Sequence, residues 1–336
     1  MDFQQKRVTQ FKIKSLGDLR RDGRVTKGIN PADFVHGPEE FDCLINKWSR
    51  GELLGVVGDS GTGKSEVVLA MFKTILENNP DSCAVYVSLE MTDQKISERW
   101  TGICGDNTEL ADRLYVISRY DEDGKSRNVS MNWIKNELSK YNTVLEDIIV
   151  FAIDHVHCLG DNDASTLNSM MIKLKEMSVE LHAFGIPMAQ VNKGAGQKGE
   201  VPLDADAVLG CSQFKYICSD IIQIHRPILR FEEAADMSVL GWGYAKVREA
   251  TKEDKARRGQ NKLLLYDMDL RKLRKMTTNE YTNFKVYYND LLEAKSAEDK
   301  SKAYAYDLTR EIKGENGKVV VINEIWSGDR SKDDGL

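Results

Sequence analysis

The chain has 336 residues, of which 41% are hydrophobic and 30% are charged, and its formal net charge at pH 7 is −6. A chain of this length and composition can bury one large core and is typical of a soluble globular protein. The acidic balance argues against a protein whose whole surface is basic and binds nucleic acid. No apolar stretch approaches the length that crosses a membrane, so no membrane partner is expected.

The six cysteines are scattered along the chain and form no Cys-x-x-Cys pair. The sequence therefore argues against a zinc site and against a disulfide framework. The polar start, MDFQQKRVTQ, lacks the pattern of a signal peptide. Both features favour a location in a reducing cytoplasm.

The first 40 residues are predicted to form an N-terminal arm and a linker. Val8, Phe11, Leu16 and Leu19 would share one face of a helix, with Lys and Arg residues opposite. This face is too small to stabilise an isolated helix, so it should pack either on its own domain or on a neighbouring subunit. The segment GINPADFVHGPEE then reads as a linker with turn residues.

From Leu53 onward, short apolar runs alternate with helical segments. Helices are predicted at 65–77 and 164–184, and the second has an apolar stripe that should end at Gly185 and Pro187. Strands that alternate with helices predict an α/β domain with a largely parallel sheet. The runs that read as buried strands are LLGVVG, AVYVSLE, IIVFAID, GIPMAQV and DIIQIH.

After Trp242 the pattern changes. GWGYAKV and KLLLYDMDL predict two sequential strands, which the charged loop ATKEDKARRGQN would join as a hairpin at the sheet edge. A polar tail from Thr277 is predicted to be helical over 281–302, and its last residues, SGDRSKDDGL, are predicted to be disordered. Basic strips at 1–28 and 252–275 could meet phosphates, but a solvated surface is the favoured interpretation of each.

The segment GDSGTGKSEVV, which begins at Gly58, carries the strongest functional signal. It matches Gly-x-x-x-x-Gly-Lys-Ser in full, after a predicted strand and at the start of a predicted helix. Glycines let backbone N–H groups curl around an anion, and the helix N-terminus adds a favourable dipole. Lys64 would reach the β- and γ-phosphates of ATP, and the Ser65 hydroxyl would bind Mg²⁺. The expected nucleotide contacts in this segment are Gly58, Ser60, Gly61, Thr62, Gly63, Lys64, Ser65 and Glu66.

Polar residues end three other predicted strands, and open α/β sheets bind their ligands at such carboxyl ends. Asp154 ends IIVFAID, where the second metal-binding carboxylate of a P-loop protein belongs. Glu90 ends AVYVSLE and could polarise the water that attacks the γ-phosphate. Gln190 could hydrogen-bond that phosphate and report its loss. His155 and His157 also suggest a metal site, but because they begin a loop and Asp154 already has a role, we expect no His-bound transition metal.

Six segments occur in an order that resembles a known family: GELLGVVGDSGTGKS, VSLEM, VFAIDHVH, GIPMAQVNK, SDIIQIHRP and GYAKVRE. Over residues 30–275 or so, they resemble the RecA-like motor domain of DnaB-type hexameric replicative helicases, including phage ring helicases. The resemblance implies a RecA-like P-loop ATPase with a largely parallel central sheet, a short N-terminal helical arm and a helical C-terminal tail. The domains would then be 1–40 (arm and linker), 41–276 (motor domain) and 277–336 (tail), with ATP and Mg²⁺ as cofactors.

The resemblance also implies a catalytic role for individual residues. Asp154 would be the Walker B acid, Glu90 the catalytic base and Gln190 the γ-phosphate sensor, while Lys64 would bind the phosphates. Lys246 and Arg248 match the lysine and arginine fingers that family members insert into the site of the neighbouring subunit. Arg226 is the main competitor for the role of arginine finger.

Two loops would face a central channel and grip single-stranded DNA, one at 157–163 and the other at 193–212. Lys193, Lys198 and Gly210 are the expected contacts to the strand. The resemblance thus implies a homo-oligomer, expected to be a hexamer, that translocates on single-stranded DNA and unwinds duplex. A loader, a primase or a polymerase would be its protein partners.

Two departures from the family leave other functions open. No N-terminal helicase domain or primase is expected before the arm, and Glu249-Ala250 replaces the familiar Asn-Gly. One alternative is a RecA-like ATPase that binds DNA or a partner without unwinding, such as a recombinase-like filament or a loader. Another is a protein-remodelling or signalling switch that binds no nucleic acid. The stretch NKGAGQKG bears on the choice, since its N–H groups and lysines suit phosphate contacts, although a plain loop explains it equally well.

Overall fold

The structure is a computed structural model. The residues that it describes are 34–35, 48–120, 124–145, 147–159, 164–191, 208, 212–226, 239–247, 262–267, 272–308, 312–313 and 319–320. The predicted arm helix and the last ten residues lie outside these ranges. The chain divides into two compact units, one made of Met1–Pro227 with Ser238–Lys275 and the other of Ile228–Met237 with Met276–Leu336. The domain boundaries given above stay a prediction.

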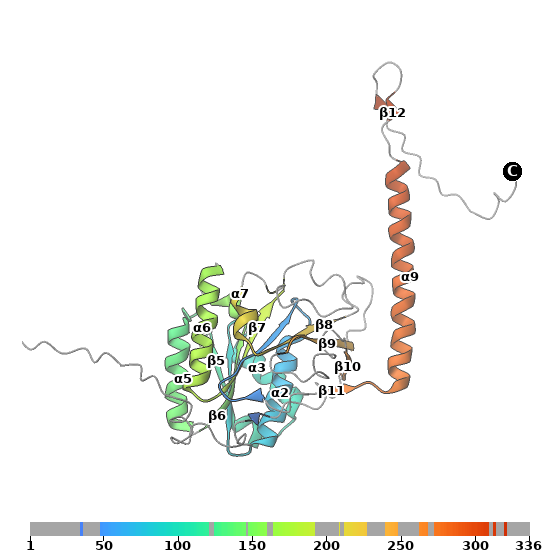
Figure 1. Cartoon of the computed structure of the whole chain (residues 1–336). Coiled ribbons are helices and arrows are strands. Elements are labelled where there is room, and N and C mark those ends of the chain that lie inside the picture. Colours follow the sequence, from blue (N-terminus) through green and yellow to red (C-terminus); the bar gives the residue numbers. More distant parts are fainter. Residues whose placement is uncertain are drawn as a thin grey trace, which may run out of the picture. The chain divides into compact units, whose positions relative to one another are not determined.

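The first unit is built on a nine-stranded sheet with the strand order β11-β10-β9-β8-β3-β7-β6-β4-β5 (Figure 1). The strands are β3 (Leu54–Gly58), β4 (Cys83–Ser88), β5 (Leu114–Ser118), β6 (Ile148–Asp154), β7 (Phe184–Gln190), β8 (Asp220–His225), β9 (Val239–Lys246), β10 (Lys262–Asp267) and β11 (Lys272–Lys275). The strands from β8 to β5 pair in parallel, and β9, β10 and β11 extend one edge in antiparallel pairing. The predicted α/β class and the predicted hairpin, which is β9–β10, are confirmed.

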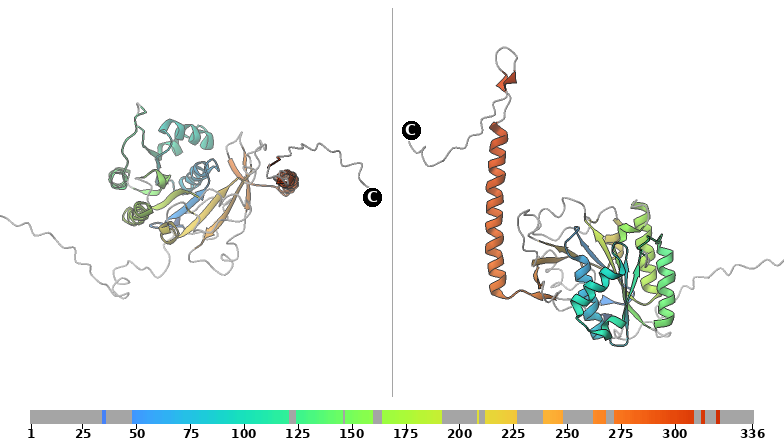
Figure 2. Two further views of the ribbon diagram at one scale, coloured as in Figure 1. Left: turned by 90° about the horizontal axis from the view of Figure 1, so that it is seen from above. Right: turned by 180° about the vertical axis from the view of Figure 1, so that it is seen from behind.

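Helices cover both faces of this sheet (Figure 2). They are α2 (Lys64–Asn78), α3 (Asp93–Cys104) and α4 (Thr108–Asp112) on one face, and α5 (Met131–Leu145), α6 (Ala164–Glu180) and α7 (Ser212–Ile217) on the other. Strand residues alternate between two cores, so that Val56 and Tyr86 pack toward α2 whereas Val57 and Val87 pack toward α5 and α6. Because the central strands are buried on both faces, they read as continuous apolar runs in the sequence.

One predicted helix end is wrong. The helix expected to reach Phe184 ends at Glu180, and His182 then turns the chain with a φ angle of 50°. Phe184 begins β7, where its ring stacks on Trp48 with 5.2 Å between the ring centroids. Gly185 and Pro187 therefore lie inside the strand rather than ending the helix, because burial of Phe184 in the sheet outweighs the local helical pattern.

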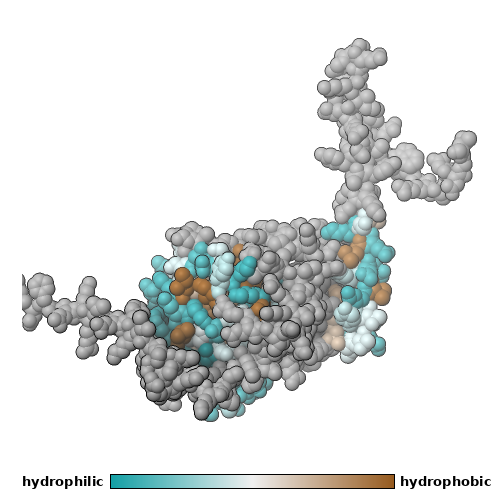
Figure 3. Space-filling view, viewed as in Figure 1, coloured by the Kyte–Doolittle hydropathy of each residue, from teal (hydrophilic) through white to brown (hydrophobic). Residues whose placement is uncertain are grey.

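The first unit also contains a short strand from the predicted linker, since β1 (Phe34–Val35) pairs antiparallel with β2 (Trp48–Ser49). On the face formed by α5 and α6, apolar residues lie among polar ones (Figure 3), and the exposed fractions of Ile172 and Val179 are 49% and 58%. Scattered apolar side chains of this kind are common on protein surfaces.

The second unit contains the long helix α9 (Thr278–Leu308) and a short antiparallel pair, β12 (Ile312–Lys313) with β13 (Val319–Val320). A capping box starts the helix: the Thr277 amide donates to the Glu280 carboxylate at 2.8 Å, and the Glu280 amide donates to the Thr277 hydroxyl at 3.3 Å. The region predicted to be helical, 281–302, lies within α9. No helix in the described ranges is long and apolar enough to cross a membrane.

Candidate active site

The predicted phosphate loop joins β3 to α2, and two of its glycines are required by its shape. Gly63 has a φ angle of 95°, in the left-handed region that favours glycine, immediately before the first helical residue. At Gly58, a Cβ atom would lie 2.4 Å from the Ile224 carbonyl oxygen of the neighbouring strand β8. The Thr62 hydroxyl donates to the Asp59 carbonyl at 2.8 Å and closes the turn. Ser60 and Gly61 form its exposed tip.

Lys64 starts α2, and its side chain folds back over this loop. Its Nζ donates to the carbonyl oxygens of Gly58 at 3.1 Å and Asp59 at 2.8 Å. Burial lowers the pKa of Lys64, while the carboxylates of Asp154, Glu90 and Asp59 act in the opposite direction. The ammonium therefore lies between the loop and the two acids, where a cation can bind phosphate.

Asp154 ends β6 and is almost completely buried, and it accepts two side-chain hydrogen bonds on one carboxylate oxygen. The Ser65 hydroxyl donates to Oδ2 at 2.7 Å, and the Tyr86 hydroxyl donates to the same oxygen at 2.5 Å. Burial raises the pKa of Tyr86 well above its usual value, so the phenol stays protonated and remains a donor. The adjacent hydroxyl and carboxylate oxygens of Ser65 and Asp154 are hard ligands of the type that Mg²⁺ prefers.

We expect Tyr86→Phe to lower the free energy of unfolding by about 1.5–3 kcal/mol, because a buried carboxylate loses a hydrogen-bond donor. Urea unfolding of the full chain measures this change. Tyr216→Phe on α7 is the matched control, since that side chain is 63% exposed and water replaces its hydroxyl contacts. Equal stability of the two variants would contradict the role assigned to Tyr86.

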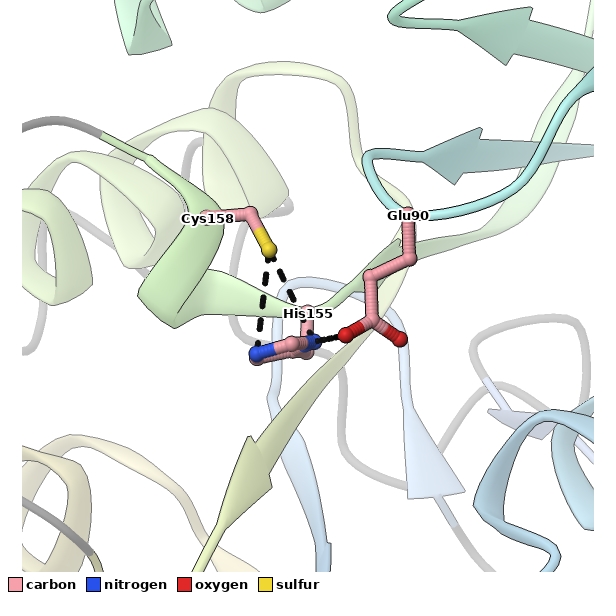
Figure 4. A group of neighbouring side chains, drawn as sticks. All are labelled: Glu90, His155 and Cys158. Carbon is pink, nitrogen blue, oxygen red and sulfur yellow. Dashed lines mark hydrogen bonds and ion pairs between the residues drawn. The ribbon is translucent and has the colours of Figure 1, made fainter. Parts of the chain in front are cut away.

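Glu90 follows β4, and strand pairing brings it beside Asp154. Ser88 is in register with Asp154, and the Leu89 amide donates to the Asp154 carbonyl at 2.8 Å. The Glu90 side chain is 45% exposed, and its Oε1 lies 3.1 Å from Nδ1 of His155 (Figure 4). The hydrogen bond with His155 lowers the pKa of Glu90, so the carboxylate is ionised and open to solvent, as a general base must be.

The two histidines after Asp154 face different neighbours, one before and one within the short turn η3 (Val156–Cys158). Burial by itself lowers the pKa of His155, but contacts with Cys158 and Glu90 outweigh it and raise that pKa to about 9. His157 points elsewhere, since its Nδ1 accepts from the Gln190 amide at 3.4 Å. The sequence did not indicate Cys158, whose Sγ lies 3.7 Å from Nε2 of His155.

The remaining predicted groups of this site also surround the P-loop. Gln190 ends β7 in register with Gly58 of β3, so it reaches the phosphate loop. The carboxylate of Glu66 pairs with Arg99 of α3 at 3.5 Å. Arg226, the competitor for the finger role, donates from Nε to the Thr62 carbonyl at 3.3 Å, within its own P-loop.

Lys246 is far from this cluster. It pairs with Ile221 near the start of β8, which runs parallel to β3, so Lys246 lies at the opposite edge of the sheet from the P-loop. Its Nζ donates to the Cys218 carbonyl at 2.5 Å and to the Lys215 carbonyl, at the end of α7. The structure thus separates Lys246 from its own phosphate loop. Arg248, Lys193, Lys198 and Gly210 lie outside the described residues.

Comparison with solved structures finds the same fold in helicase and ATPase domains. The chain is similar to a DnaB-like replicative helicase, described together with its interactions with primase, with a TM-score of 0.61 and 14% identity over 79% of this chain and 68% of that one. It is also similar to a second solved structure, an isolated ATPase domain, with a TM-score of 0.58 and 14% identity over 78% of this chain and 97% of that one. These likenesses confirm the predicted RecA-like fold, and at this identity they show the fold alone. No protein-family model and no curated protein matches the sequence.

Proposed function

We propose that the protein is an ATP hydrolase that works as a ring-shaped oligomer, translocates on single-stranded DNA and unwinds duplex. The observation that carries the proposal is the meeting of Lys64, Ser65, Asp154 and Glu90 at one edge of a parallel sheet. A phosphate-loop lysine, a hydroxyl paired with a carboxylate, and a second carboxylate open to solvent are the groups that phosphoryl transfer to water requires.

Each group has its own task in this proposal. The P-loop N–H groups and Lys64 bind and orient the β- and γ-phosphates of ATP. Glu90 accepts the proton of the water that attacks the γ-phosphate, with ADP and inorganic phosphate as products. Gln190 contacts the γ-phosphate and reports its loss. Ser65 and Asp154 would hold Mg²⁺, which when bound neutralises phosphate charge.

We infer that a neighbouring subunit completes each ATP site. Lys246 lies at the edge of the sheet opposite its own P-loop, and Arg248 follows two residues later in the chain. A lysine at this edge serves a phosphate most easily on an adjacent subunit. The placement of Lys246 therefore supports a shared site, for which we propose a hexamer.

The nucleic-acid part of the proposal rests on sequence and on the fold. Lys193, Lys198 and Gly210 are the proposed contacts to single-stranded DNA, since lysine side chains and glycine N–H groups suit backbone phosphates. The likeness to a DnaB-like helicase that interacts with primase supports DNA and a primase as partners. A loader and a polymerase are further proposed partners, in the cytoplasm.

The test measures ATP hydrolysis by the full chain with Mg²⁺, with and without single-stranded DNA, together with strand separation on a forked duplex. Lys64→Ala is expected to reduce hydrolysis by about 10²–10³-fold, as the loss of one preorganised group does where charge develops. Lys73→Ala is the matched control on the same helix, because the Lys73 ammonium contacts the Ile103 carbonyl away from the P-loop.

Hydrolysis at the wild-type rate in Lys64→Ala would contradict the assigned ATP site. Hydrolysis that DNA does not stimulate, without strand separation, would instead favour a RecA-like ATPase that acts on a partner without unwinding.

A further inference from the structure

Three side chains with metal-ligating atoms meet next to the ATP site. Glu90, His155 and Cys158 each offer one such atom, and the three atoms lie within 4.8 Å of one another (Figure 4). Oε1 of Glu90 is 3.1 Å from Nδ1 of His155, and Sγ of Cys158 is 3.8 Å from the same nitrogen. Within the part of the chain that the structure describes, this is the one group of its kind.

The turn that carries Cys158 is fixed from several sides. The Cys158 amide donates to the His155 carbonyl at 3.0 Å, and the Arg119 guanidinium donates to the Cys158 carbonyl. Leu159, the next residue, is fully buried in the core. The thiol and the imidazole therefore come from a short, anchored segment, and only the Glu90 side chain has room to move.

These separations suit a small tetrahedral ion. Zn²⁺ binds nitrogen, sulfur and oxygen at about 2.0–2.3 Å, which places neighbouring ligand atoms of a tetrahedron about 3.3–3.8 Å apart. His155 is almost fully buried, whereas the Glu90 side chain is 45% exposed, so an ion could enter from the solvent side. Water could supply the fourth ligand there, as at open zinc sites with three protein ligands.

We propose that Glu90, His155 and Cys158 form a binding site for a thiophilic divalent transition metal, with Zn²⁺ as the leading candidate. Cys158 would bind as the thiolate and His155 through a deprotonated ring nitrogen, and both protons would pass to solvent. Mg²⁺ would not compete, since thiolate and imidazole are poor ligands for a hard cation.

The site has a consequence that rests on the proposed function. The carboxylate that would bind Zn²⁺ is the one proposed to take the proton of the attacking water. A bound ion would occupy Glu90, so ATP hydrolysis would stop while the P-loop, on the other side of Asp154, could still bind nucleotide. Zn²⁺ would thus inhibit the enzyme at a position separate from the Mg²⁺ ligands Ser65 and Asp154.

The experiment uses Co²⁺ as a spectroscopic probe on the full chain, without nucleotide. One equivalent of Co²⁺ is expected to give a thiolate-to-cobalt charge-transfer band and the intense visible bands of a tetrahedral site, and Zn²⁺ should abolish both. Loss of a group outside the ligand shell costs 10–100-fold in affinity, so Cys158→Ser, which loses a ligand, is expected to weaken Co²⁺ binding by at least about tenfold and to remove the charge-transfer band. Cys104→Ser is the matched control, because that thiol lies at the end of α3 outside the group.

A charge-transfer band that is absent from the wild-type protein, or that survives in Cys158→Ser, would overturn the proposal. A second measurement needs no variant: Zn²⁺ should protect Cys158 but not Cys104 of the wild-type protein from alkylation, as read by mass spectrometry. Equal labelling of Cys158 with and without Zn²⁺ would also overturn it.

A hydrolysis assay then separates this inference from the proposed function. Zn²⁺ is expected to inhibit ATP hydrolysis by the wild-type protein at concentrations at which Cys158→Ser remains active. A protein that binds Co²⁺ through Cys158 but hydrolyses no ATP would support the metal site and contradict the ATPase proposal. Hydrolysis that Zn²⁺ inhibits equally in both proteins would contradict the inhibitory role.

Discussion

Replacing Glu90 by glutamine is expected to reduce ATP hydrolysis by about 10²–10⁴-fold, the usual contribution of a general base. An amide cannot accept the proton of the attacking water, although it keeps the size of the carboxylate. Lys64, Ser65 and Asp154 are unchanged in this variant, so ATP binding should persist. Single-turnover hydrolysis and equilibrium binding of a fluorescent ATP analogue measure the two effects separately.

Glu98→Gln is the matched control for this substitution. Glu98 lies on α3, where its carboxylate accepts from the Gln94 side chain at 3.1 Å on the exposed surface. We expect that variant to hydrolyse ATP as the wild-type protein does. A Glu90→Gln protein with the wild-type rate would mean that another group takes the proton.

Arg248→Ala is expected to reduce hydrolysis even further, by about 10³–10⁵-fold, as the loss of an arginine finger does in other phosphoryl-transfer enzymes. At 1.36 kcal/mol for each factor of ten, this corresponds to ~4–7 kcal/mol of the activation barrier. An arginine in an exposed ion pair would contribute about 1 kcal/mol or less to stability and nothing to turnover. The rate of hydrolysis per subunit, measured against protein concentration, should rise as the shared site assembles.

Mixing variants tests whether the finger acts across subunits. Arg248→Ala subunits have an intact P-loop, and Lys64→Ala subunits have an intact finger, so a mixture should recover part of the activity. Arg226→Ala is the control that acts within one chain, because Arg226 contacts its own Thr62 carbonyl. Its mixture with Lys64→Ala should not recover, since no chain would hold both groups. Recovery with Arg226→Ala but not with Arg248→Ala would move the finger to Arg226.

The fold of the first unit could be predicted because its signals are local. Each central strand is an apolar run, and the P-loop has a fixed spacing between a strand and a helix. Weaker signals were missed: the edge strands β5 and β11 were not predicted. β7 shows the limit of periodicity, because Phe184 continues the apolar stripe of α6 in the sequence but stacks on Trp48 in the sheet.

The site could be predicted only where one segment defines it. Asp154, Glu90 and Gln190 were found as polar residues at strand ends, and the pairing of β3 with β7 and of β4 with β6 explains why such ends converge. Tyr86 was missed because a tyrosine within an apolar strand gives no sign of its partner until the strand register is known. The approach of Cys158 to His155 and Glu90 likewise depends on how η3 turns after β6.

The position of Lys246 links two events that the sequence treats separately. One ammonium group cannot serve two sets of oxygen atoms, so a Lys246 that moved to a phosphate of the adjacent subunit would give up its hydrogen bonds to the Lys215 and Cys218 carbonyls. These carbonyls end α7, which begins at Ser212, directly after the segment proposed to hold DNA. Phosphate and the end of α7 would therefore compete for the same cation. ATP arriving at one subunit would release a tether in the next, and loss of the phosphate would restore it.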